Sequence, residues 1–107
     1  MVSPRRTDHS RGPLFRLGQL VATPGAIEVM ERLGIDPLGL IARHVTGDWG
    51  DIHPEDRGLN EQALRDGSRI FSVYGARDSD DCLWVITEAQ DDEGNRLATT
   101  IPRPVDY

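Results

Sequence analysis

The hydrophobic period of the chain changes at Gly67, and this change restricts the fold more than any other feature of the sequence. Before Gly67, apolar residues recur every three to four positions, which is typical of amphipathic helices. After it, short runs rich in β-branched and aromatic residues alternate with Asp, Gly, Asn and Ser, which is typical of strands joined by turns. The sequence therefore predicts an α+β fold in which N-terminal short helices are followed by strands.

Three helices are expected, and each begins at a proline. In Thr23-Pro24 and Asp36-Pro37, a side chain that can accept a backbone amide hydrogen precedes a proline at the first helical position, where its missing N–H costs nothing. A third helix begins at Pro54, with acidic residues following where the helix dipole favours them. The three predicted helices end at Gly34, Gly47 and Gly67.

Three strands are expected in the second half of the chain, at residues 69–74, 82–87 and 97–101. Short polar turns separate them, so we predict a three-stranded antiparallel β-meander. The second strand is apolar at nearly every position and should be the central, buried one. The apolar segment 14–21 precedes the helices and is either an edge strand or an extended lead-in.

The length of 107 residues fits one domain, which we expect to span residues 14–107, after a flexible arginine-containing arm at residues 1–13. No apolar stretch approaches the roughly 20 residues that cross a bilayer, so a cytoplasmic protein without membrane contact is expected. A single cysteine, Cys82, excludes an internal disulfide. Because Cys82 lies in an apolar run, we expect it to be buried. No cofactor is predicted.

The charge distribution points to the kind of partner. The net charge is −6, and because residues 1–16 hold four Arg against one Asp (+3), residues 17–107 carry −9. Duplex-DNA-binding domains usually present a basic patch, so duplex DNA is not expected as a partner, whereas a basic protein or nucleoprotein complex is. The simpler alternative, that acidic loops keep a small domain soluble, stays open. The predicted partner-binding residues in the two hairpin loops are Asp78, Asp80, Asp81, Asp91, Asp92 and Glu93.

The densest polar segment, residues 44–60, lies between two predicted helices. Its imidazoles and carboxylates are metal-ligand types, but their spacing matches no recognised metal motif, so no metal site is predicted. We predict instead a second partner-binding patch formed by Trp49 and Asp51. The competing interpretation is a capped loop, in which Asp48 or Asp51 accepts backbone amide hydrogens and the Trp49 ring packs over the domain.

The sequence leaves other functions open, among them a small regulator that acts through a homodimer. A metal-independent, ribonuclease-like hydrolase would combine an imidazole, a carboxylate and a guanidinium group, although no nucleophile stands beside a base at a diagnostic spacing. Trp84 and Tyr74, on neighbouring predicted strands, would suit a stacking platform for single-stranded bases, but the surrounding acids would repel phosphates. The hydrolase would use His44 or His53 with Glu88 and with Arg69 or Arg96.

Several runs resemble a family of small, uncharacterised bacterial proteins that occur on plasmids and other mobile elements, some of them labelled as restriction-system subunits. The most specific are Gly-Asp-Trp-Gly-Asp at residues 47–51 and Trp-Val-Ile-Thr-Glu-Ala at residues 84–89, and the similarity covers residues 14–107. The family supplies no catalytic residue. The hairpin loop at residues 90–96 departs from the family pattern because it is longer and more acidic.

Mobile-element kinship and concentrated acidity together predict a stoichiometric protein-binding module. Such a protein could inhibit a host defence complex, as an anti-CRISPR or antirestriction protein, by offering carboxylates where a basic groove expects phosphate.

Overall fold

In residues 12–76 and 78–107, which the computed structural model describes, three α-helices begin at the predicted prolines: α2 at Pro24–Leu33, α3 at Pro37–Val45 and α4 at Pro54–Asp66. Thr23 Oγ1 accepts a hydrogen bond from the Ala26 amide (3.1 Å), and the Asp36 carboxylate accepts one from the Leu38 amide (3.0 Å). These bonds satisfy amides that the first turn would leave unpaired. Most of the predicted arm, all of it except residues 12 and 13, lies outside the described residues.

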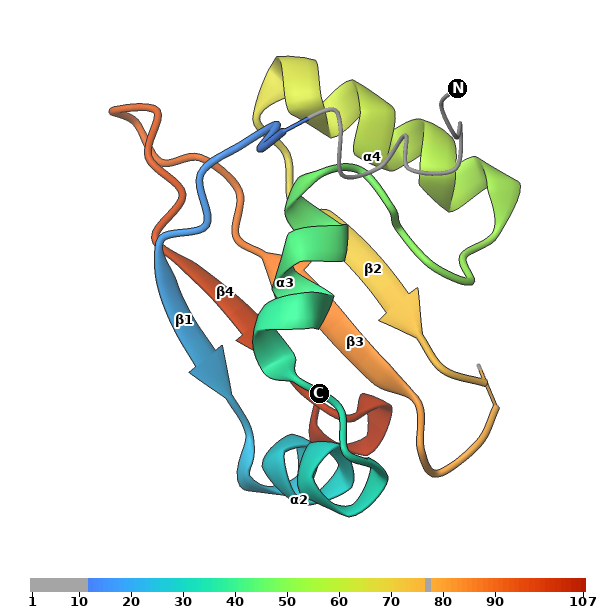
Figure 1. Ribbon diagram of the computed structural model, residues 1–107. Helices are drawn as coiled ribbons and strands as arrows, with labels where there is room; N and C mark the ends of the chain where they lie inside the picture. The colour runs from blue at the N-terminus through green and yellow to red at the C-terminus, as the bar shows by residue number, and fades with distance from the viewer. Residues whose placement is uncertain (1–11, 77) are drawn as a thin grey trace, which may run out of the picture.

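The described strands form one mixed sheet of four strands in the order β1-β4-β3-β2 (Figure 1). Strand β3 pairs antiparallel with both β2 and β4, as predicted for the second half of the chain. The segment left open as strand or lead-in supplies β1, which pairs parallel with β4. The sheet is therefore not a three-stranded meander alone, and one strand precedes the helices. The strands span Gln19–Ala22 (β1), Ile70–Tyr74 (β2), Leu83–Thr87 (β3) and Ala98–Ile101 (β4).

Helix α3 crosses one face of the sheet, and α2 lies at the end of that face (Figure 1). Strand alternation points Tyr74, Leu83 and Val85 toward these helices, where all three are buried. Cys82, expected to be buried, has no exposed surface. No helix in the described ranges is long and apolar enough to cross a membrane. The remaining buried members of this core are Ala26, Val29, Met30, Leu40, Ile41 and Ile101.

The opposite face of the sheet carries aromatic side chains. Phe71 and Trp84 are half-buried there, and their rings meet edge to face with centroids 5.1 Å apart. A short 3₁₀ helix, Pro104–Asp106, follows β4 and brings the Tyr107 ring to 5.8 Å from that of Trp84. We call this the aromatic face.

Candidate functional site

A hollow of about 300 Å³ opens on the aromatic face beside β2. Its apolar floor comes from Phe71, Val73 and Trp84 of strands β2 and β3, and its polar side chains are three aspartates and one histidine. We call it the acidic hollow. Its polar lining is formed by Asp51, His53, Asp56 and Asp78, and Ile52 and Pro104 complete it.

The sheet register explains the floor. Residues 71 and 73 are two apart in β2 and therefore share a face, and Val73 lies opposite Trp84 in β3. Trp84 thus stands beside Val73 and within ring contact of Phe71. The two strands therefore place the Trp84 indole and the Phe71 phenyl group side by side on one face of the sheet.

Three segments bring the acids to this floor. Asp51 is held beside β2 because its amide donates to the Val73 carbonyl oxygen at 2.8 Å. His53 is the residue before α4, and Asp56 lies in the first turn of that helix. Asp78 lies in the loop between β2 and β3. Residues separated by 27 positions in the chain therefore surround one hollow.

The chemistry of the acidic hollow suits a cation with an apolar stem. Among the residues that the structure describes, Asp56 and Asp78 form no ion pair. An indole beside carboxylates attracts guanidinium and ammonium groups through the ring face as well as through charge. Within the described part of the chain, no group of three or more His, Cys, Asp or Glu side chains could hold a metal ion.

The predicted acidic patch is divided between two places. The loops that join β2 to β3 and β3 to β4 lie at opposite ends of the antiparallel strands (Figure 1). Asp78, Asp80 and Asp81 therefore lie far from Asp91, Asp92 and Glu93. The six residues do not form one continuous face, because consecutive turns of a meander alternate between the two ends of the sheet.

Two of these carboxylates already have partners. Asp81 pairs with Arg32 of α2 at 3.0 Å, and the Asp91 carboxylate accepts hydrogen bonds from the amides of Glu93 and Asn95 at 2.9 Å each. Asp91 therefore shapes its own turn. Asp80, Asp92 and Glu93 are exposed, and Asp78 lines the acidic hollow.

Trp49 does not offer its ring to a partner, contrary to its predicted role. It is 1% exposed, stacks on Phe15 with centroids 6.3 Å apart, and donates from Nε1 to the Glu61 carboxylate at 3.1 Å. A large apolar ring gains more by burial in this small core than by exposure. Asp51 is exposed and lines the acidic hollow, so the predicted pair is separated.

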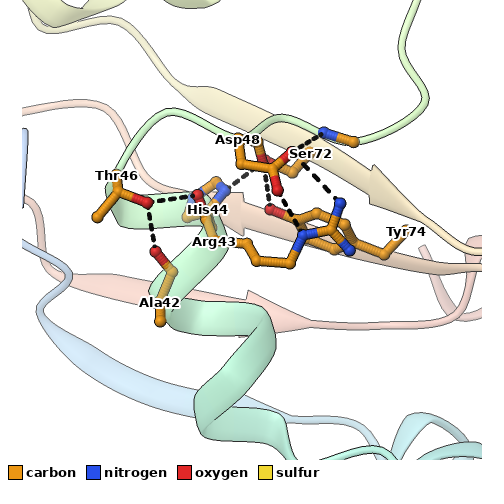
Figure 2. Close-up of polar contacts among 8 residues, drawn as sticks. Ala42, Arg43, His44, Thr46, Asp48, Ser72 and Tyr74 are labelled. Atoms are coloured by element: carbon orange, nitrogen blue, oxygen red, sulfur yellow. Dashed lines mark hydrogen bonds and ion pairs between the residues drawn. The ribbon is translucent and has the colours of Figure 1, made fainter. Parts of the chain in front are cut away.

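Asp48 holds the Gly-Asp-Trp-Gly-Asp loop against α3 and β2, as the capped-loop interpretation predicts (Figure 2). Its carboxylate accepts from Arg43 at 2.6 and 3.3 Å and from the Gly50 amide at 3.3 Å. The Tyr74 hydroxyl donates to the Asp48 carbonyl oxygen at 2.6 Å. The loop is therefore a structural connection between the helix and the sheet.

A chain of hydrogen bonds crosses the sheet beneath α3. His44 Nδ1 lies 2.6 Å from Ser72 Oγ (Figure 2), and Nε2 lies 2.8 Å from Thr87 Oγ1. Thr87 and Thr99 hydroxyls are 2.7 Å apart, and Thr99 donates to the Leu17 carbonyl oxygen at 2.8 Å. Because the Thr99 hydroxyl donates its hydrogen to the Leu17 carbonyl oxygen, the Thr87 hydroxyl must donate to Thr99. His44 Nε2 must then donate to the Thr87 hydroxyl. Ser72 then donates to Nδ1, so a neutral imidazole satisfies every member.

The Ser72 and His44 pair has the spacing of a nucleophile and its base, but it is closed to substrate. Both side chains are fully buried. Burial, and to a smaller extent the charge of Arg96, lowers the pKa of His44 to about 3. The imidazole nitrogen opposite Ser72 meets a threonine hydroxyl in place of an orienting carboxylate. The pair therefore organises the core.

The groups of the hydrolase alternative are scattered over the described structure. His44 is in the core, His53 lines the acidic hollow, and Glu88 is exposed just beyond β3. Arg96 is 6% exposed and donates to the carbonyl oxygens of residues 63, 68 and 88 at 3.1, 2.7 and 2.9 Å. Arg69 donates to the Tyr107 hydroxyl at 2.7 Å. These groups do not converge on one cavity.

Trp84 and Tyr74 do not form a stacking platform. Tyr74 lies opposite Leu83 in the register, so its ring is on the α3 face, whereas Trp84 is on the aromatic face. Tyr74 is 4% exposed, and the Arg43 guanidinium lies 4.4 Å from its ring centroid. The aromatic neighbours of Trp84 are Phe71 and Tyr107.

The fold and the hollow define a small α+β domain with an acid-rimmed, aromatic-floored surface site. Comparisons with protein-family models, curated proteins and solved structures return no match. The kinship inferred from the two sequence runs remains a prediction. The contribution of Phe71 to the site was missed in the sequence, although its two-residue spacing from Val73 carried the signal.

Proposed function

We propose that this protein is a stoichiometric binding module that receives basic side chains of a partner protein in the acidic hollow. The observation that carries the proposal is the combination of Asp51, Asp56 and Asp78 with the indole of Trp84 around one cavity. An arginine or lysine could lay its methylene stem on the apolar floor while its charged end meets the carboxylates.

The partner in this proposal is a basic groove of a host defence complex, of the CRISPR or restriction type, in the cytoplasm. The net charge of −6 would attract such a groove over a distance of about one Debye length, and the hollow would then fix the contact. Occupation of the groove would exclude the phosphate backbone that it normally binds. The exposed Asp80, Asp92 and Glu93 would contribute to attraction from both ends of the sheet.

The first test uses an oligo-arginine peptide and the emission of Trp84. Binding should change the fluorescence of the wild type, and Trp84→Phe should abolish the change because the other indole, Trp49, is buried. Replacing Asp56 and Asp78 together by Asn should weaken binding about tenfold, since two carboxylates facing the cation are lost.

The matched control removes the same charge outside the hollow. Replacing Asp80 and Asp92 together by Asn removes the same amount of negative charge. Because neither residue lines the acidic hollow, this double variant should weaken binding only slightly at physiological salt. Equal weakening by the two double variants would mean that the peptide responds to overall charge, and the proposal would fail. Capture from a host extract with the wild type, and loss of the captured complex with the hollow variant, would then identify the partner.

A further inference from the structure

Strand β1 is the outermost strand on one side of the sheet, and no other described strand pairs with its outer edge (Figure 1). The Gln19 amide donates to Leu97 O at 3.0 Å, and the Thr23 amide donates to Ile101 O at 3.1 Å. In a parallel ladder alternate residues bond to the same neighbour, so the N–H and C=O groups of Leu20 and Ala22 point outward. Such an edge is a template for a further strand.

Apolar side chains surround this edge. Leu20, Val21 and Leu38 are 47%, 42% and 65% exposed. Between β1 and the start of α3 lies a groove of about 220 Å³. We call the edge and this groove the β1 surface. The groove is lined by Leu20, Val21, Ala22, Pro37, Leu38, Ile41, Thr99 and Ile101.

Charge indicates what fits the β1 surface. Residues 17–27 and 37–42, which contribute most of it, include no charged residue in a chain of net charge −6. Two copies repel one another in general, but at this surface no like charges would face each other. A basic partner would find no carboxylate in either segment. A second copy of this chain is therefore the occupant that the charge pattern favours.

We propose that the protein forms a symmetric homodimer through antiparallel pairing of β1 with β1 of a second copy. The outward groups fix the register: Leu20 of one copy lies opposite Ala22 of the other, so each outward N–H meets an outward C=O. Val21 then lies opposite Val21 across the two-fold axis, on the aromatic face. Leu20 and Leu38 of both copies gather on the α3 face, and the two sheets become continuous.

This inference is independent of the acidic hollow, which lies at the other side of the sheet, so either proposal can fail alone. Sedimentation velocity over a range of concentrations tests it. The wild type should dimerise, and Val21→Asp should weaken dimerisation about a hundredfold or more, because two carboxylates would stand opposite each other at the axis. Val21→Thr, which keeps the branched shape and adds no charge, should still dimerise. Circular dichroism serves to check that each variant is folded.

Charge complementation tests the register itself. Val21→Asp and Val21→Lys should each be monomeric alone, and their mixture should give a heterodimer in native mass spectrometry. A wild type that remains monomeric throughout the range overturns the proposal, including the case in which the edge serves a different protein. A Val21→Asp variant that dimerises like the wild type, or a mixture that gives no heterodimer, overturns it as well.

Discussion

The two outer edges of the sheet are finished in opposite ways. On β2, the outward groups of Phe71 are met by the Asn60 side chain, which donates to the Phe71 carbonyl oxygen at 2.7 Å and accepts from its amide at 3.1 Å. Further along, Val73 N donates to the Trp49 carbonyl oxygen at 3.0 Å. On β1, among the residues that the structure describes, no such cover meets Leu20 or Ala22.

Shielding of the β2 edge needs particular residues. Gly50 bridges to Val73 with φ of 76°, and a Cβ there would collide with the Val73 carbonyl oxygen. A side chain at position 50 would thus push the loop away from the strand. The chain therefore uses a buried amide and a glycine to close the edge beside the acidic hollow. The open edge at β1 consists only of a short uncharged strand. The contrast fits the two proposals, in which the β1 edge pairs with a second copy and the β2 side holds the acidic hollow.

The largest expected effect follows from removing the shield of the β2 edge with Asn60→Ala. Asn60 is 3% exposed, and its loss leaves the part-buried N–H and C=O of Phe71 without these partners. Each unsatisfied buried group costs about 1–3 kcal/mol, and because these two are only part-buried, we expect the free energy of unfolding to fall by about 2–4 kcal/mol. Urea denaturation followed by circular dichroism measures it.

Arg57→Ala on the same helix is the control for Asn60→Ala. Arg57 is exposed, and its replacement should change the free energy of unfolding by less than about 0.5 kcal/mol. If both variants lose similar amounts, the Asn60 contacts do not stabilise the edge.

The second expected effect concerns pH, because the chain of hydrogen bonds that joins the two sides of the sheet needs a neutral His44. The pKa of His44 is lowered from 6.5 to about 3 in the folded state, so below pH 6.5 the unfolded chain binds the proton more readily. The contribution of the neutral ring is complete above pH 6.5 and is lost as the pH falls toward 3. Between pH 7 and pH 4 the loss should be about 3 kcal/mol.

Other acidic groups also change stability in this range, so the measurement needs a variant without the imidazole. His44→Gln keeps a donor and an acceptor but does not titrate. Its free energy of unfolding should therefore depend less steeply on pH between 6.5 and 4 than that of the wild type. Parallel pH profiles would show that His44 is not the group that becomes protonated on unfolding.

Local signals in the sequence were sufficient for the helices and for β2, β3 and β4. Thr23-Pro24 and Asp36-Pro37 combine a cap with a fixed backbone angle, and both act within one turn. The role of β1 was not predictable in this way. Its partner β4 is more than 70 residues away in the chain, and four residues carry too little pattern to specify a parallel pairing.

The candidate site was harder to predict than the fold. Asp51 and Asp78 were identified by charge alone, and the sequence could not show that they surround one hollow. That proximity depends on the register of Val73 with Trp84 and on the bridge at Gly50, both of which are tertiary. The prediction for Trp49 is wrong because a polar loop suggests exposure, whereas the ring packs in a core cluster with Ala63 of α4 and Ile70 of β2.

The smallest expected effect compares one substitution at both edges, Val73→Thr and Val21→Thr. Val73 is 3% exposed, so a hydroxyl there is buried beside the acidic hollow and should lower the free energy of unfolding by about 1–2 kcal/mol. Val21 is 42% exposed, and the same hydroxyl reaches solvent in the monomer, so the change should stay below about 0.5 kcal/mol. Denaturation at low protein concentration, where dimerisation contributes least, measures both. Equal losses would mean that the two edges are equally enclosed, because only burial separates these otherwise identical substitutions.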